Sequence, residues 1–245
     1  MTPRITLAVA ARVLTQLRRD PRTIVLMLVV PCLLITLLWW MFKDLPGDTF
    51  DLIGPALIAM FPFIVMFLVT SVTTLRERAS GTLERLLAMP MGKLDFLLGY
   101  ALAFGVVAAL QAVLAVSVSV SLLGLDIQGP VWLLGLVAVA DAVLGSALGL
   151  FVSAFAQTEF QAVQFMPALV LPQVLLCGLF VARDELPDVL HAISNVLPLS
   201  YAVDAMTKLT QGTDTTEVWQ DLLVVAAFAL GALALGAATL RRRTP

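Results

Sequence analysis

Charged residues, histidine and cysteine are all scarce in this sequence of 245 residues. Only 13% of the residues are charged, against about 25% in a typical soluble domain, while 60% are hydrophobic. A soluble fold of this length has too small an interior to bury so much apolar surface, so lipid is the expected solvent. His191 is the single histidine, and the two cysteines, Cys32 and Cys177, lie inside apolar runs. We therefore expect no metal site, no directly bound cofactor and no disulfide scaffold.

Two further absences bear on function. No G-x-x-x-x-G-K-[ST] phosphate loop occurs, because Gly92-Lys93 lacks the preceding glycine and is followed by Leu94. The chain is therefore expected not to be an ATP-hydrolysing enzyme. No small-residue cleavage pattern closes the first apolar run, so no cleavable signal peptide is expected. No pattern in the sequence predicts a nucleic-acid partner.

Long apolar runs dominate what is present. A helix needs about 20 apolar residues to cross about 30 Å of hydrocarbon. Six segments meet this requirement, at about residues 23–42, 52–75, 94–123, 131–156, 160–181 and 219–240. Because these runs are continuously apolar and lack the alternation of barrel strands, they predict an all-α integral membrane protein. We expect residues 1–245 to form a single transmembrane domain.

The positive charges are strongly segregated along the chain. Twelve of the 15 Lys and Arg residues lie before the first span, between the second and third spans, or after the last span. With six spans, these three segments share one side of the membrane. The positive-inside rule assigns that side to the cytoplasm, so both termini are predicted to be cytoplasmic.

Residues 3–20 predict an amphipathic helix that lies in the membrane interface. Ile5, Val9, Val13 and Leu17 recur every four residues, with arginines around the other side. Asp20 then precedes Pro21, which suits a helix cap followed by the first position of span one. The simpler alternative is that span one begins early.

Residues 76–93 form the longest loop on the arginine-rich side. Gly81 breaks the helix that leaves span two, Thr82 can cap a new short helix, and Pro90 marks its end. Leu83, Leu86 and Leu87 share one face of that helix by their three- and four-residue spacing. From these residues alone, the segment is either a docking element for a cytoplasmic partner or a basic loop that obeys the positive-inside rule.

Residues 182–218 form a long connection on the opposite side. This segment is too apolar for a solvated loop and too interrupted for a full span. Short helices that re-enter the outer leaflet as a hairpin would satisfy both facts. A pair of amphipathic helices on the membrane surface is the alternative.

Several side chains inside the spans are candidates for a substrate path. Asp141 lies about ten residues into span four, where a carboxylate costs about 2.5–3.5 kcal/mol unless it faces protein or water. It could line the path, relay protons, or make a structural hydrogen bond, with Gln111 as one possible partner. Phe63, Met66 and Phe67 could offer an adaptable apolar surface to a drug-like molecule, or pack in the core.

The order and spacing of these motifs resemble the membrane subunits of type-2 ABC exporters, the ABC-2 permease family. The resemblance covers nearly the whole chain. It is strongest in the segment Arg76-Glu77-Arg78…Gly81-Thr82-Leu83-Glu84-Arg85-Leu86-Leu87…Pro90. A second match runs from Gln161 through Pro167 and Gly178-Leu179-Phe180 to Pro198-Leu199-Ser200-Tyr201-Ala202-Val203-Asp204.

The resemblance implies more than the residues show. The loop after span two would be a coupling helix that docks on a separate ATPase subunit, present in two copies, which binds ATP and Mg. The implied coupling residues are Glu77, Gly81, Thr82, Leu83, Glu84, Arg85, Leu86, Leu87 and Pro90. A second permease half, expected to be another copy of this chain, would complete the substrate path in a bacterial inner membrane. The expected substrate is a small hydrophobic drug, an antibiotic or a lipid-like molecule.

Two other functions remain open from the residues. A proton-driven secondary transporter would need several ionisable groups within the membrane, and Asp141 is the available candidate. A membrane enzyme would need a nucleophile with its base or a metal cluster, which a single histidine in the outer connection does not supply.

Overall fold

The computed structural model describes residues 3–44, 49–80, 93–212 and 215–239. Within these ranges the chain forms helices and no strands. Six of the helices are long and apolar enough to cross a membrane. The structure therefore confirms the prediction of an all-α fold with six candidate spans.

The six long helices follow the predicted order along the chain. Their bounds are α2 Pro21–Phe42, α3 Thr49–Ala79, α5 Lys93–Ser117, α6 Val131–Ser153, α7 Glu159–Leu176 and α10 Thr215–Thr239. The shorter elements are α1 Pro3–Arg18, η1 Val118–Leu122, η2 Arg183–Glu185, α8 Asp188–Ser194 and α9 Pro198–Gln211. The fifth long helix ends before residue 181 because Gly178 adopts a φ of 98°, which glycine allows and other residues rarely adopt.

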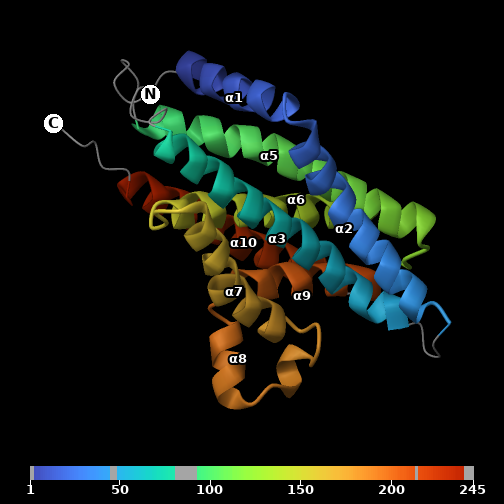
Figure 1. The fold of residues 1–245 in the computed structure, drawn as a ribbon. Helices are drawn as coiled ribbons and strands as arrows, with labels where there is room; N and C mark the ends of the chain where they lie inside the picture. Colours follow the sequence, from blue (N-terminus) through green and yellow to red (C-terminus); the bar gives the residue numbers. More distant parts are fainter. Residues whose placement is uncertain (1–2, 45–48, 81–92, 213–214, 240–245) are drawn as a thin grey trace.

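α3 and α6 form the centre of the bundle (Figure 1). A methyl group added at Gly145 of α6 would lie 2.5 Å from the carbonyl oxygen of Phe63 in α3. The same addition at Gly149 would lie 2.5 Å from the carbonyl oxygen of Phe67. Only a residue without a side chain fits at these two positions, so the Gly-x-x-x-Gly spacing brings the two backbones into direct contact.

The start of α2 is fixed as the sequence predicts. Asp20 lies just before the helix, and its Oδ1 accepts a hydrogen bond of 3.3 Å from the backbone N–H of Thr23. The Thr23 hydroxyl donates a second bond, of 2.6 Å, to Asp20 Oδ2. Pro21 occupies the first turn, where its missing N–H is not needed. The cap separates α1 from α2, so span one does not simply begin early.

The connection after α7 folds into η2, α8 and α9. α8 projects away from the other helices, whereas α9 lies against the bundle (Figure 1). Lys208 near the end of α9 forms ion pairs of 2.8 Å with Asp221 and 3.3 Å with Glu217 in α10. The described part of the segment thus consists of short helices, as its sequence suggests, and its re-entry into the membrane stays a prediction.

Candidate functional site

The arginine-rich end of the bundle carries the largest predicted site, the coupling segment. Of its predicted residues, Glu77 lies within the described part of the chain, at the end of α3. The others fall outside the described residues: Gly81, Thr82, Leu83, Glu84, Arg85, Leu86, Leu87 and Pro90. The site is therefore built from the helices that lead into and out of this segment.

α1 is attached to the helix that enters the segment. The Nη2 atom of Arg12 lies 3.0 Å from Oε1 of Glu77, three residues before the last described residue of this stretch, Ser80. Glu77 is buried, and Arg12 is about one third exposed. A buried carboxylate needs a charged or hydrogen-bonding partner, and Arg12 supplies it from α1.

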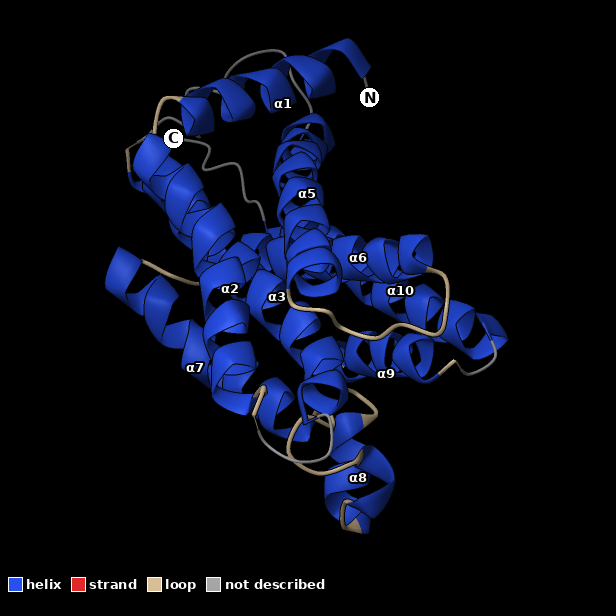
Figure 2. Ribbon diagram, turned by 90° about the vertical axis from the view of Figure 1, so that its right-hand side faces the viewer, coloured by secondary structure: helices blue, strands red, loops and turns tan. Residues whose placement is uncertain are grey.

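α1 is also attached to the helix that leaves the segment. A methyl group added at Gly99 of α5 would lie 2.6 Å from Val9 of α1, so the two helices touch at this glycine. One turn earlier in α5, Asp95 accepts a 3.3 Å hydrogen bond from the hydroxyl of Thr6. Figures 1 and 2 show α1 lying along the outside of the bundle against the start of α5.

The apolar stripe predicted in α1 therefore faces protein. Val9, Val13 and Leu17 are buried, and Ile5 is partly buried. This stripe fixes α1 to the bundle, whereas Arg4 and Arg18 are exposed. The location of α1 at a membrane surface stays a prediction.

A third contact joins the entry to the segment with α7. Nε and Nη2 of Arg76 donate hydrogen bonds of 2.8 and 2.9 Å to the two carboxylate oxygens of Glu159. Thr158 caps α7 at this point, because its hydroxyl accepts a 3.2 Å bond from Gln161 N–H. Both members of the ion pair are more than half exposed, so the pair orients the helix ends more than it stabilises them.

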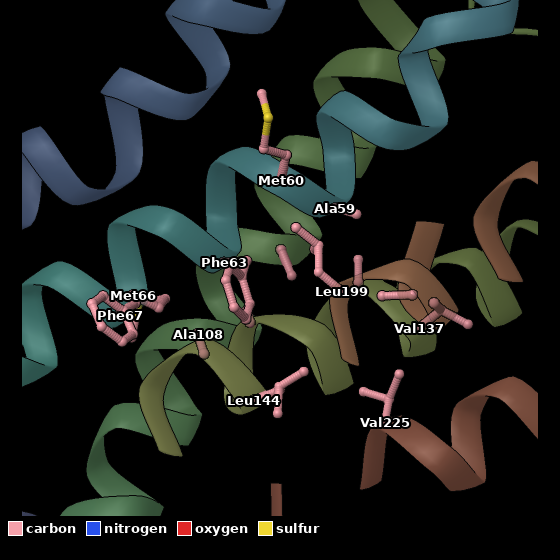
Figure 3. Packing of buried hydrophobic residues seen from close by; sticks show 14 of the residues in the cluster. Ala59, Met60, Phe63, Met66, Phe67, Ala108, Val137, Leu144, Leu199 and Val225 are labelled. Atoms are coloured by element: carbon pink, nitrogen blue, oxygen red, sulfur yellow. The ribbon is translucent and has the colours of Figure 1, made fainter. Parts of the chain in front are cut away.

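The five predicted substrate-path residues lie inside the single chain. Phe63, Met66 and Phe67 are buried on α3, and Figure 3 shows Phe63 and Phe67 within the core cluster. Gln111 of α5 and Asp141 of α6 are also buried. This placement gives no test of their predicted role in a path between two chains.

Asp141 lies on the α6 face that contacts α3. It stands one helical turn from Gly145 and two from Gly149, which are the points of backbone contact. Neither carboxylate oxygen has a hydrogen-bond partner among the described residues. Both amide atoms of Gln111 likewise lack a partner within the described ranges. The structural hydrogen bond between these two residues, one of the interpretations open from the sequence, is not formed.

Arg183 is one of the three Lys and Arg residues outside the arginine-rich segments, and the sequence alone assigns it no role, yet it is the hub of the η2–α9 segment, where several side chains meet. Its guanidinium pairs with Asp204, donates 2.6 and 3.2 Å bonds to Asn195 Oδ1 and Ser194 Oγ, and lies over the ring of Tyr201. Burial raises the pKa of Asp204, and the neighbouring guanidinium opposes that effect. No local pattern could reveal this hub, because Asp204 is 21 residues away in the sequence.

Ionisable groups do not gather into a metal site in the described portion of the chain. No group of three His, Cys, Asp or Glu side chains is placed so that it could hold a metal ion there. What the described geometry offers instead is mechanical, since one surface helix is attached to both helices that flank residues 81–92.

Comparison with known proteins identifies a family and several relatives. The model of the ABC-2 type transporter family matches residues 5–210. The chain is 27% identical over 184 residues to ABC transporter G family member 20 of Dictyostelium discoideum, covering 74% of this chain and 25% of that protein. It is 26% identical over 156 residues to the probable multidrug ABC transporter permease YbhS of Escherichia coli K12, covering 63% and 41%.

A third relative is the probable multidrug ABC transporter permease YbhR, also of Escherichia coli K12. The identity is 26% over 169 residues, covering 69% of this chain and 46% of YbhR. The chain thus spans between 25% and 46% of the length of these three relatives.

Proposed function

This chain belongs to the ABC-2 type transporter family, and from that premise we propose that it is the membrane permease subunit of an ATP-driven exporter. Permeases of this family are membrane subunits that work with ABC ATPase subunits. The proposed cargo is a small hydrophobic drug, an antibiotic or a lipid-like molecule. ATP and Mg would be bound by two copies of a separate ATPase, on the side of the membrane that holds both termini.

The observation that carries this proposal is the double attachment of α1. Arg12 contacts Glu77 where the chain enters residues 81–92, and Thr6 and Val9 contact α5 just after the chain leaves them. A force applied to this segment by a docked ATPase would therefore reach α1, α3 and α5 together. In this account, α1 keeps the two helix ends at a fixed separation, and the segment acts as a lever on both.

The centre of the bundle would pass that movement on. α3 cannot slide freely along α6, because Gly145 and Gly149 hold the two backbones in contact. Tightly packed helices respond to a local push as rigid units. A displacement of the end of α3 would thus be felt at the far end of α6.

We propose that a second copy of this chain covers α2 and α7 and completes the path. In Figure 2, both helices lie on the same side of α3. α7 has a mean hydropathy of 1.2, against 2.1 or more for the other candidate spans, yet only 22% of it is buried within the chain. A helix with polar residues such as the exposed Gln164 on its surface suits a protein or aqueous neighbour better than lipid.

The first experiment is co-expression with a candidate ABC ATPase subunit from the same organism, followed by extraction in mild detergent. Joint elution with ATPase activity would support the proposal. Changing Leu83, Leu86 and Leu87 together to Asp should abolish joint elution. The matched control is Leu52→Asp, an exposed leucine near the opposite end of α3. If the control loses joint elution equally, or if the triple variant keeps it, the three leucines are not the docking site.

Glu84→Arg separates docking from coupling in the same complex. The ATPase should stay bound, because the leucine face is intact, while transport is lost. ATP-driven transport at the normal rate by this variant would remove the role proposed for Glu84.

One observation keeps a proton-driven carrier as the second candidate. Asp141 is buried with both oxygens unpartnered among the described residues, as an intramembrane proton carrier could be. Asp141→Asn removes the proton site with little change of shape. Loss of transport driven by a pH gradient without ATP, in this variant alone, would favour that mechanism.

A further inference from the structure

We propose that the groove between α2, α3 and α7 binds one acidic phospholipid from the leaflet on the arginine-rich side. The groove has a volume of about 350 Å³ and opens on the surface of the single chain. The described residues that line it include neither Asp141 nor a predicted coupling residue. The proposal therefore holds or fails independently of the exporter function and of the cargo.

One wall of the groove is a continuous stripe of α3. Its residues recur at helical spacing and are Val65, Leu68, Val69, Val72, Thr73 and Arg76. All but the last two are aliphatic, so the wall changes from apolar to polar and then cationic toward the end of the helix. This gradient matches that of a phospholipid, whose acyl chains end in a charged headgroup.

The opposite wall is a shorter stripe of α2, and it also changes from apolar to polar toward the end near Arg76. Thr23 lies at the end near Arg76, followed by Leu26, Met27 and Val30. Val163 of α7 closes the third side. Both long walls therefore place their polar residues at the same end of the groove.

The length of the groove matches one leaflet. From Val65 to Arg76, α3 rises about 16 Å at 1.5 Å per residue. Half of a hydrocarbon core of about 30 Å is about 15 Å. An acyl chain along the stripe would reach the middle of the membrane while its phosphate lay beside Arg76.

The polar end of the groove, at Thr23 and Arg76, is its mouth, and it offers hydrogen-bond donors to a phosphate. Glu159 holds the Arg76 guanidinium through Nε and Nη2, which leaves Nη1 to donate to a phosphate oxygen. Arg76 is the arginine that lines the groove. Arg19 and Arg22 precede Thr23 in the chain, are exposed, and form no ion pair among the described residues.

The local carboxylates are already engaged. Glu159 is paired with Arg76, and Asp20 caps α2 through Thr23. The hydrogen bonds from Thr23 lower the pKa of Asp20, and the charge of Arg76 lowers it further. Arg76 in the groove, together with Arg19 and Arg22 just before Thr23 in the chain, outnumbers these two carboxylates, so an anionic headgroup is favoured over a neutral one.

Charge also argues against a second copy of this chain as the direct occupant of the mouth. A two-fold axis along the membrane normal would pair residues that lie at the same depth in the two copies. The arginines of one copy would therefore face the arginines of the other. An anionic lipid between the copies would relieve that repulsion. This last role rests on the proposed dimer, whereas lipid binding to the single chain does not.

The test is native mass spectrometry of the full chain with dioleoyl phosphatidylglycerol or dioleoyl phosphatidylcholine added in steps. The wild type should retain the acidic lipid at least about fivefold better, as expected for about 1 kcal/mol from one arginine near the headgroup. Val69→Trp fills the groove and should abolish retention of the added lipid. Arg76→Gln should abolish only the preference for phosphatidylglycerol, and Arg76→Lys should keep much of it.

The matched control is Leu110→Trp, at an exposed position of α5 away from the groove, which should behave as the wild type. Equal retention of the two lipids by the wild type would overturn the proposal. An acidic-lipid preference that survives Val69→Trp would also overturn it. A third result would overturn it as well: Val69→Trp loses self-association while its lipid retention is unchanged. The groove would then hold a second copy of the chain rather than a lipid. If Arg76→Gln fails to fold, the proposal is still tested by comparing the retention of the two lipids in the wild type and in Val69→Trp.

Discussion

The helix pairs α3–α6 and α2–α7 are all apolar enough to cross a membrane, yet they differ in what covers them. Within their apolar windows, 61% of α3 and 67% of α6 is buried inside the chain, against 17% of α2 and 22% of α7. Composition does not explain the contrast, because α2 has the highest mean hydropathy of the six and α7 the lowest. The central pair is completed by its own fold, whereas the outer pair needs lipid or another chain to cover it.

This difference separates stability from function. Changes at the α3–α6 contact should destabilise the fold, because the two helix backbones are in direct contact and leave no space for a larger side chain. Changes on the exposed sides of α2 and α7 should leave the fold intact and alter only what binds there.

The largest effect is expected at the central contact. Gly145→Leu would place side-chain atoms against the Phe63 carbonyl, and we expect a loss of about 3 kcal/mol of unfolding free energy. Thermal unfolding of the purified chain followed by size exclusion would measure it. Gly135→Leu is the control on the same helix, because a Cβ atom added there has no neighbouring atom within 4 Å. Equal melting temperatures for the two variants would contradict the assigned contact.

A smaller effect is expected where α7 leads into the η2–α9 segment. Arg183→Gln removes the partner of Asp204 and the bonds to Asn195 and Ser194, at a cost of about 2 kcal/mol. Because this hub lies outside the central pair, the loss should be local. Hydrogen exchange should speed up in residues 183–204 and stay slow in α3 and α6. Faster exchange throughout the bundle would show that the segment supports the core.

The smallest effect is expected at the exposed end of α7. Arg76→Gln breaks the ion pair with Glu159, but both side chains are more than half exposed, so the cost should stay below about 1 kcal/mol. The melting temperature should therefore shift far less than in Gly145→Leu. A comparable shift would mean that the outer helices hold the fold together, and the contrast between the two pairs would fail.

Much of the fold could be predicted from the sequence. Apolar run length indicates the six spans, and Asp20-Pro21 predicts the start of α2, because both signals are local. The Gly145-x-x-x-Gly149 spacing is typical of close helix packing. Its partner on α3 cannot be named from the sequence, because helix pairing depends on contacts distant in sequence. The contacts of Arg183 and the groove between α2, α3 and α7 could not be predicted for the same reason.

The candidate site was predicted in part. Glu77 was singled out by its motif, and the structure adds its partner Arg12, which lies 65 residues earlier in the chain. A buried acid within an arginine-rich end indicates that some cation is near, but no sequence pattern tells which. The roles of residues 81–90 and of Asp141 stay predictions.

The most direct test of the central claim uses inside-out vesicles that contain the chain and its ATPase, with uptake of a hydrophobic dye as the readout. The account predicts uptake that requires ATP, survives collapse of the pH gradient, and is lost in Glu84→Arg while the ATPase stays bound. Uptake driven by a pH gradient without ATP, and lost in Asp141→Asn, would contradict the account and identify a proton-driven carrier.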